Sequence, residues 1–151
     1  MELVDLYDEN RLPLGWTAER DARKGPGEYR LVVHVCVFDR RGRLLIQQRA
    51  RSKFIFPNLW DVSVGGGVDA GETSRQGAER EFREELGVPL DLSGLRPSVT
   101  VNFDGGFDDF YLLIRDLSLK DLTLQQEEVQ DVRWAALEEV LDLLARENFI
   151  P

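Results

Sequence analysis

The stretch GGGVDAGETSRQGAEREFREELGV (residues 65–88) carries the signals of a helix start and a helix end. Thr73 can cap the N-terminus, and Gln76 three residues later completes a capping box. Gly87 stands where a helix commonly ends in a left-handed residue. At about 100° per residue, one apolar stripe then lines the helix: Ala78, Phe82 and Leu86. We therefore predict a helix from Thr73 to Leu86.

This helix carries an acidic face beside its apolar stripe. The face holds three glutamates: Glu81, Glu84 and Glu85. Like charges one turn apart cost a helix a few tenths of a kcal/mol per pair. A solvated acidic face near Arg80 is one interpretation. The other is a site for a hard divalent cation, which takes oxygen ligands. Gly77, one turn before Glu81, is expected to leave open space beside the carboxylates.

The rest of the chain predicts a mixed sheet with a second helix. The expected strands are 30–38, 43–49, 59–64, 98–103, 110–117 and 129–134. The first two are expected to form a hairpin around the turn at 39–42, and a loop with Asp104, Gly105 and Gly106 joins two later strands. Residues 137–147 place leucines and a valine at helical spacing. The fold class is α/β or α+β, with the sheet sandwiched between helices.

Composition limits the classes of function. The chain has 151 residues, which suits a single domain over 1–151, with 1–27 as an extension that is irregular or a hairpin. No segment resembles a signal peptide or a membrane span, so we expect a cytoplasmic protein that binds no membrane. Cys36 is the one cysteine, which excludes an internal disulfide. A net charge of −9 disfavours nucleic acid as a partner, including an RNA-decapping role.

The stretch 65–88 resembles the Nudix box, G-x5-E-x7-R-E-U-x-E-E-x-G-U, in which U is apolar. Every fixed position is filled: Gly66, Glu72, Arg80, Glu81, Phe82, Glu84, Glu85, Gly87 and Val88. The resemblance implies a Nudix fold and Mg²⁺- or Mn²⁺-dependent hydrolysis of a diphosphate bond. The substrate would be a nucleotide or a nucleotide-linked metabolite, a small molecule. A catalytically weak module that binds a ligand is the alternative, and the intact carboxylate set disfavours it.

The resemblance also implies roles for individual residues. Glu81 and Glu85 are the expected metal ligands, and Glu84 is a ligand or an assisting base. Gly65 is expected to offer its backbone carbonyl to the metal. Arg80 is expected to pair with Glu72 and hold the loop to the helix. Dimers are common in the family, which makes a homodimer possible, but no exposed apolar stripe in the sequence identifies an interface.

One further acid outside the box is expected at the site. Glu128 resembles a metal ligand on a late strand of MutT-type members, and Glu127 is its rival. Asp108 and Asp109 are the second candidate pair. Each of these four acids can equally be an ordinary surface residue.

The segment 44–64 is similar to isopentenyl-diphosphate isomerases, which share the Nudix fold. In those enzymes an Arg and a Lys before a Pro-x-x-Trp bind the substrate diphosphate, and Arg49 and Lys53 match them here. An exposed basic loop is the alternative. The isomerase reaction needs a cysteine and a histidine where this chain has Gly65 and Gly67. The sequence therefore predicts an isomerase-like hydrolase and not an isomerase.

Five other residues invite a functional interpretation. His34 and Cys36 lie in the expected strand 30–38, and we expect both to pack in the sheet. Phe54, Phe56 and Trp60 can stack on a nucleobase or belong to the core.

Overall fold

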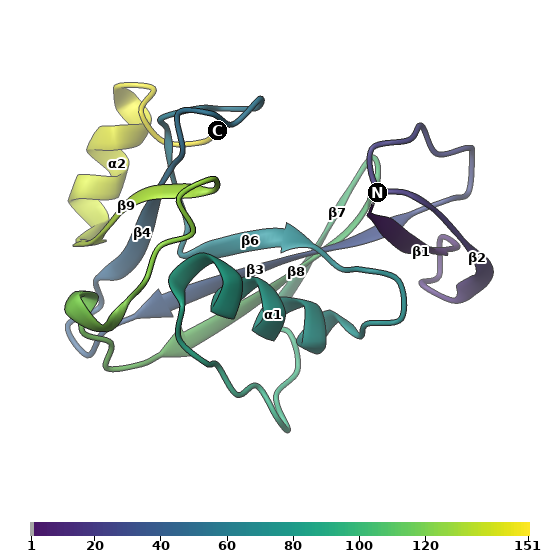
Figure 1. Cartoon of the computed structure of the whole chain (residues 1–151), viewed down its shortest axis with the longest axis horizontal. Helices are drawn as coiled ribbons and strands as arrows, with labels where there is room; N and C mark the ends of the chain where they lie inside the picture. The colour runs from purple at the N-terminus through teal and green to yellow at the C-terminus, as the bar shows by residue number, and fades with distance from the viewer. Residues whose placement is uncertain (1) are drawn as a thin grey trace.

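The computed structural model describes residues 2–151. Its elements in chain order are β1 (Leu3–Tyr7), β2 (Pro13–Glu19), β3 (Arg30–Phe38), β4 (Leu44–Arg49), β5 (Trp60–Asp61), β6 (Val64–Gly67), α1 (Ser74–Leu86), β7 (Val99–Phe103), β8 (Gly106–Ile114), the 3-10 turn η1 (Leu119–Asp121), β9 (Val129–Ala135) and α2 (Leu137–Ala145). The N-terminal extension is a hairpin of β1 and β2, set apart at one end of the molecule (Figure 1). No helix among residues 2–151 is both long enough and apolar enough to cross a membrane.

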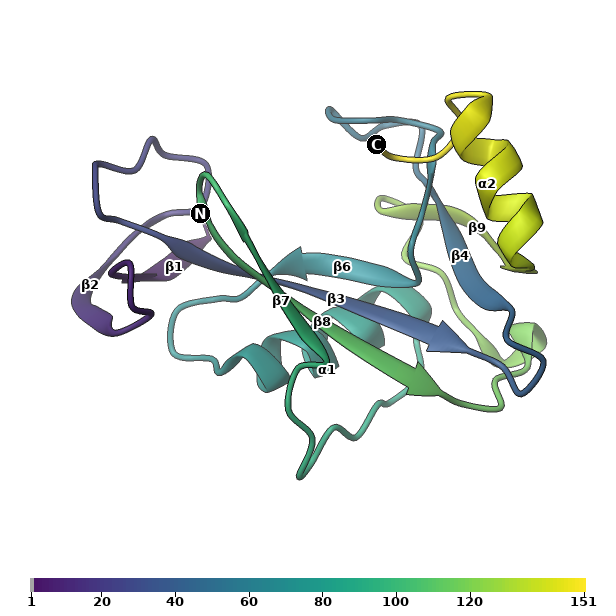
Figure 2. The ribbon, with the colours of Figure 1, turned by 180° about the vertical axis from the view of Figure 1, so that it is seen from behind.

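Strand β3 is the centre of the main sheet. It pairs in parallel with β8 along its whole length, and antiparallel with β6 over Val32–Val35. The path of the sheet is β5-β4-β3-β8-β7, with β9 paired to β4. Parallel and antiparallel pairs therefore occur together, as predicted for a mixed sheet. The β3 to β4 connection is a hairpin only at its turn, where Phe38 pairs with Leu44, and the two strands then diverge (Figure 2).

The single strand expected over 59–64 is wrong, because the chain changes its partner strand there. β5 pairs with β4, whereas β6 pairs with β3 and extends into the glycines of the box. Between them, the Ser63 hydroxyl accepts from the Val37 N–H and donates to the Leu45 carbonyl. The buried Ser63 thus joins the two diverging strands at the point where the chain crosses from one to the other.

The two helices lie on opposite faces of the sheet, which confirms the predicted sandwich. Alternate residues of a strand face opposite sides. Leu45 accordingly packs in the core beneath α1, with Phe82, whereas its neighbour Ile46 packs with Val140 of α2. The main core fills the α1 side between β3, β6 and β8, so it positions that helix rigidly against the glycine strand.

Helix α1 begins and ends as the sequence predicts. The Thr73 side chain accepts from the Gln76 N–H, and the Gln76 side chain accepts from the Thr73 N–H. Gly87 ends the helix with φ 75°, a left-handed conformation that glycine adopts without strain. The open space predicted at Gly77 is wrong, because a Cβ there would lie 3.0 Å from a methyl of Val68. Gly77 instead lets the loop before the helix pack closely.

Several element bounds and one packing prediction also differ, the bounds by one or two residues except in β8. β8 spans Gly106–Ile114 instead of the expected 110–117. It begins early because Phe103 pairs directly with Gly106, which leaves Asp104 and Gly105 as a tight turn. Helix α2 packs through Val140 and Leu143. The helical spacing of its remaining leucines is real, but they face outward: Leu137, Leu141 and Leu144. An exposed apolar face was not expected from the sequence.

Candidate active site

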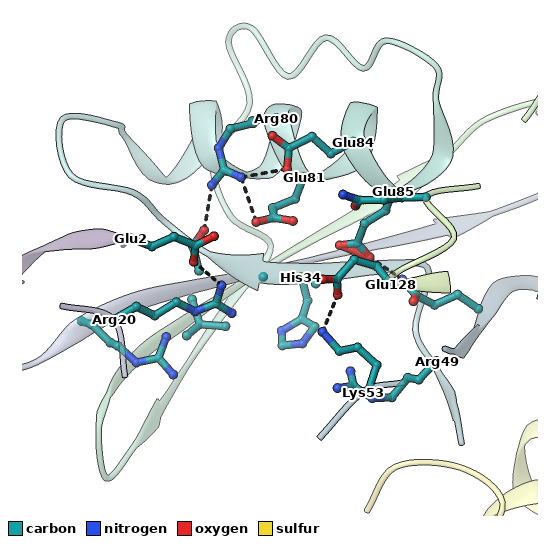
Figure 3. Close-up of a pocket in the computed structure, with 17 residues that line it drawn as sticks. Glu2, Arg20, His34, Arg49, Lys53, Arg80, Glu81, Glu84, Glu85 and Glu128 are labelled. Carbon is teal, nitrogen blue, oxygen red and sulfur yellow. Dashed lines mark hydrogen bonds and ion pairs between the residues drawn. The ribbon is translucent and has the colours of Figure 1, made fainter. Parts of the chain in front are cut away.

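A cavity of about 290 Å³ lies around the glycine end of β6. The acids of α1 stand on one side of this strand, and His34, Arg20 and Lys53 stand on the other (Figure 3). The cavity brings together every site residue predicted from the sequence: Arg49, Lys53, Gly65, Arg80, Glu81, Glu84, Glu85 and Glu128. It also contains residues that were not predicted, among them Arg20, Arg30 and Gln47.

The glycines of β6 allow two walls of side chains to approach the same strand. A Cβ on Gly66 would lie 2.4 Å from the carboxyl carbon of Glu81, far inside contact distance. A Cβ on Gly65 would lie 2.6 Å from the ring of His34. At Gly67 the neighbour is Arg20, with Nε 3.4 Å from the Cβ position. Any side chain at Gly65 or Gly66 would therefore displace a group that lines the site.

Glu85 is the most buried acid of the cavity, with 4% of its surface exposed. The Gln47 side-chain amide donates to its carboxylate at 2.8 Å. Burial raises the pKa of Glu85 well above its usual range, and the nearby charge of Glu81 raises it further. Burial also raises the pKa of Glu81, although Arg80 opposes this. These burial patterns exclude a solvated acidic face as the explanation of Glu81 and Glu85.

Arg80 joins the loop before α1 to the helix, as predicted. Its guanidinium donates to Glu72 at 2.8 and 3.0 Å and to the Gly67 carbonyl at 2.9 Å. It also donates to Glu81 at 2.9 Å and to the exposed Glu84 at 3.3 Å. Planar guanidinium groups suit such multiple contacts with carboxylates. Arg80 therefore holds the acidic face in position and balances part of its charge.

Glu128 reaches the cavity, and its rivals do not. Its carboxylate accepts a hydrogen bond from Lys53. Glu127 is exposed and lies outside the cavity. Asp109 is fully buried elsewhere, where Arg11, Ser74 and Thr100 all donate to it. Asp108 accepts a hydrogen bond from His34 Nδ1 at 2.7 Å and so reaches the site only through that ring.

Arg49 and Lys53 are not free cations on an exposed loop. Arg49 donates to the backbone carbonyls of Ile55 and Phe56 and lies 3.5 Å from the buried Asp61. Lys53 is paired with Glu128. Both line the cavity, but each already has protein partners. Local contacts hold the Arg49 side chain, and a contact with a distant segment holds that of Lys53, which disfavours the alternative of an exposed basic loop.

The donor set suits a hard divalent cation. The carboxylates of Glu81, Glu84, Glu85 and Glu128 all line one cavity, and carboxylate oxygens are the ligands that Mg²⁺ and Mn²⁺ prefer. The buried Glu85 carboxylate has only a neutral amide as its hydrogen-bond partner, so a bound cation would supply the positive countercharge. Within residues 2–151 no three acidic, histidine or cysteine side chains already converge on one point. Arg80 and Lys53 instead neutralise Glu84 and Glu128.

The remaining sequence candidates divide between site and scaffold. His34 lies in β3 as expected, but its ring stacks on Phe110 at 4.8 Å and lines the cavity. Cys36 is buried, and burial raises the pKa of its thiol to about 12. Trp60 packs in the α2 core. Phe54 is 98% exposed and, like Phe56, lies outside the cavity.

A mixed sheet between two helices, with a complete Nudix box that runs from a glycine strand through a loop into the facing helix, is the arrangement of the Nudix class of proteins. A family model described as the NUDIX domain matches residues 28–150. The chain therefore belongs to the Nudix family and is a hydrolase of that family.

Known proteins agree with this assignment. The Nudix hydrolase lmo0368 of Listeria monocytogenes is 48% identical over 151 residues, which are 100% of this chain and 89% of that protein. An isopentenyl-diphosphate Delta-isomerase of Streptomyces avermitilis is 32% identical, over 97% of this chain and 77% of its own length. The crystal structure of DR0079 from Deinococcus radiodurans superposes with a TM-score of 0.80 at 29% identity, covering 98% of this chain and 91% of that one. Isomerase-like relatives thus stand beside hydrolases, as the segment 44–64 predicted.

Proposed function

We propose that this chain hydrolyses the diphosphate bond of a nucleotide or nucleotide-linked metabolite with the help of Mg²⁺ or Mn²⁺. The observation that carries the proposal is that one cavity holds a buried carboxylate, Glu85, together with several basic side chains, namely Arg20, Arg30, Arg49, Lys53 and Arg80. A diphosphate is an anion that needs positive charge on both sides, from bound ions and from basic side chains.

The residues that would hold the ions are Glu81, Glu84, Glu85 and Glu128, with the Gly65 carbonyl. Bound ions would neutralise the phosphate charge and lower the pKa of water. A water oxygen then attacks one phosphorus, and the bridging P–O bond breaks with its electron pair going to the leaving phosphate. We assign the proton that the water loses to Glu84, which is the exposed acid of the set and can pass it on to solvent.

Arg80 acts through position, because it holds Glu81 and Glu84 by hydrogen bonds and ties the helix to Glu72. Lys53 and Arg49 are proposed to bind the substrate diphosphate. Lys53 must then exchange Glu128 for a phosphate oxygen, while Arg49 keeps its loop in shape through Ile55 and Phe56.

The test is release of phosphate, pyrophosphate or nucleotide from a panel of substrates with Mg²⁺ or Mn²⁺. The panel holds nucleoside di- and triphosphates, nucleotide sugars, dinucleotides and isopentenyl diphosphate. We expect release that needs both the metal and Glu85, with Glu85→Gln at least a thousandfold slower. Metal-independent release, or full activity of Glu85→Gln, would refute the assignment. A small-molecule substrate, a cytoplasmic location and a homodimer remain predictions.

A further inference from the structure

Two arginines that the sequence analysis did not select face the site across β6 from the helix carboxylates. Arg20 directly follows β2 of the N-terminal hairpin, and Arg30 begins β3. A Cβ on Gly67 would have Arg20 Cζ at 3.6 Å and Arg30 Nη1 at 3.7 Å. Both guanidinium groups therefore approach one point at the glycine strand, and both line the same cavity as Glu81 and Glu85.

Arg30 lacks the partners that a guanidinium in this setting needs. Its Nη1 is buried and has no hydrogen-bond partner among residues 2–151. The guanidinium lies 5.8 Å from the ring of Phe103, which supports it from the side but accepts no hydrogen bond. A buried donor left unpaired is unfavourable, because it has lost water as a partner and gained no other. Burial and the adjacent charge of Arg20 both lower the pKa of Arg30.

The other cations of the cavity are already engaged. Arg80 binds Glu72, Glu81 and Glu84, and Lys53 binds Glu128. Arg20 has one carboxylate partner, the exposed Glu2, at 2.8 Å. Among the described basic residues that line the cavity, Arg30 thus has a buried N–H donor without a partner, and Arg20 lies next to it.

We propose that Arg20 and Arg30 bind the phosphate group of the substrate that lies away from the helix carboxylates. This rests on the proposed diphosphate substrate. One phosphate would then lie on the side of Glu81 and Glu85, the residues that would hold the metal ions, and the other on the side of the two arginines, across the glycines of β6. Two guanidinium groups suit a phosphate well, because their N–H groups pair with its oxygens in a planar fork. The N-terminal hairpin therefore completes the active site.

The same two arginines also border a second cavity, which leaves room for a group attached to the phosphate that they bind. This cavity, of about 500 Å³, lies between the loop after β2 and the turn at Asp104 and Gly105. Arg20 and Arg30 line both cavities. A group attached to the phosphate at these arginines extends into the second cavity, away from the carboxylates.

The test measures binding and not turnover. Methylenediphosphonate, whose P–C–P bridge cannot be hydrolysed, and inorganic phosphate are titrated calorimetrically in excess Mg²⁺ at fixed ionic strength. The variants are Arg30→Gln, Arg20→Gln and the control Arg23→Gln. Arg23 is exposed, lies in the same segment and lines neither cavity. Thermal unfolding checks that each variant is folded. If Arg30→Gln does not fold, Arg20→Gln decides the test.

We expect the wild type to bind the diphosphonate at least tenfold more tightly than phosphate. Arg30→Gln and Arg20→Gln should lose most of that preference, whereas Arg23→Gln should keep it. A wild type with no preference, a preference retained without Arg20 and Arg30, or an equal loss in Arg23→Gln would overturn the proposal. Because no hydrolysis is measured, this failure is separate from a failure of the metal- and Glu85-dependent reaction.

Discussion

Replacing Glu85 by glutamine should stabilise the metal-free protein while it removes the activity. The wild-type carboxylate is 4% exposed, and its hydrogen-bond donor is the neutral amide of Gln47. Glutamine has the same shape and can still accept that hydrogen bond. The variant therefore keeps the packing and loses a buried negative charge beside Glu81.

The pH dependence follows from the raised pKa of Glu85. The unfolded carboxyl has its ordinary pKa of 4.5, and burial places the folded value well above it. Between these two values the folded chain binds the extra proton, so the free energy of unfolding falls as pH rises. Below pH 4.5 the Glu85 carboxyl is protonated in both states and does not lower the free energy of unfolding. Above the folded pKa it is ionised in both states, and the full cost of burying the charge is subtracted from that free energy.

The size of the effect follows from the cost of a poorly compensated buried group. That cost is about 1–3 kcal/mol, and more for a charge. At pH 8 in EDTA we expect Glu85→Gln to be more stable by at least this amount. For a chain of this length each kcal/mol raises the melting temperature by about 2–4 °C. Mg²⁺ at 100 times its dissociation constant should then stabilise the wild type by about 2.7 kcal/mol and the variant by much less.

The assay is thermal and urea unfolding of wild type and variant from pH 4.5 to pH 9, in EDTA and in Mg²⁺. Glu84→Gln is the matched control, because the Glu84 side chain is 45% exposed and should change stability by less than about 0.5 kcal/mol. A Glu85→Gln variant no more stable than wild type at pH 8 in EDTA would refute the reasoning. An equal gain in Glu84→Gln would refute it too, since the cause would then be net charge.

Three further predictions test the scaffold of the site. Gly66→Ala places a Cβ 2.4 Å from the Glu81 carboxyl carbon, so we expect turnover to fall at least tenfold with an unchanged circular dichroism spectrum; normal turnover would contradict the packing of the glycine strand. Arg80→Gln breaks the charged hydrogen bonds to Glu72 and should cost about 1.5–3 kcal/mol in urea unfolding, so an unshifted midpoint would argue against this tie. Burial raises the pKa of Cys36 to about 12, so at pH 8 a thiol reagent should label it only after denaturation; rapid labelling of the native chain would show that the thiol is accessible.

Local signals were enough for the elements that the sequence predicts well. The caps of α1 involve Thr73, Gln76 and Gly87, whose partners lie within a few residues. Strand β3 has the predicted bounds, because a run of β-branched residues needs no distant information to favour a strand. The break between β5 and β6 was missed, since it depends on bonds from Ser63 to Val37 and Leu45. The spacing of the α2 leucines identified a helix but not the face that packs.

The residues of the site likewise fall into those that local sequence spacing identified and those that only the fold revealed. A fixed order of residues along one loop and one helix identified Arg80 and the glutamates of α1, because a helix sets their relative positions. Arg20 and Arg30 have no such spacing, and basic residues at strand ends give no signal by themselves. Glu128 was separated from Glu127 only when the fold showed which of them reaches Lys53.

The sequence by itself determined the Nudix family, the capped helix and the acidic face, because these depend on neighbours along the chain. The tertiary structure alone decided the burial and the partners of the charged groups around the site. Glu85 is buried by Gln47, Glu128 is matched by Lys53, and Arg30 is left with an unpaired donor. Each of these outcomes is a contact, or the lack of one among residues 2–151, between segments far apart in sequence. Burial and pairing set the free energy of a charge, and only the folded chain fixes both.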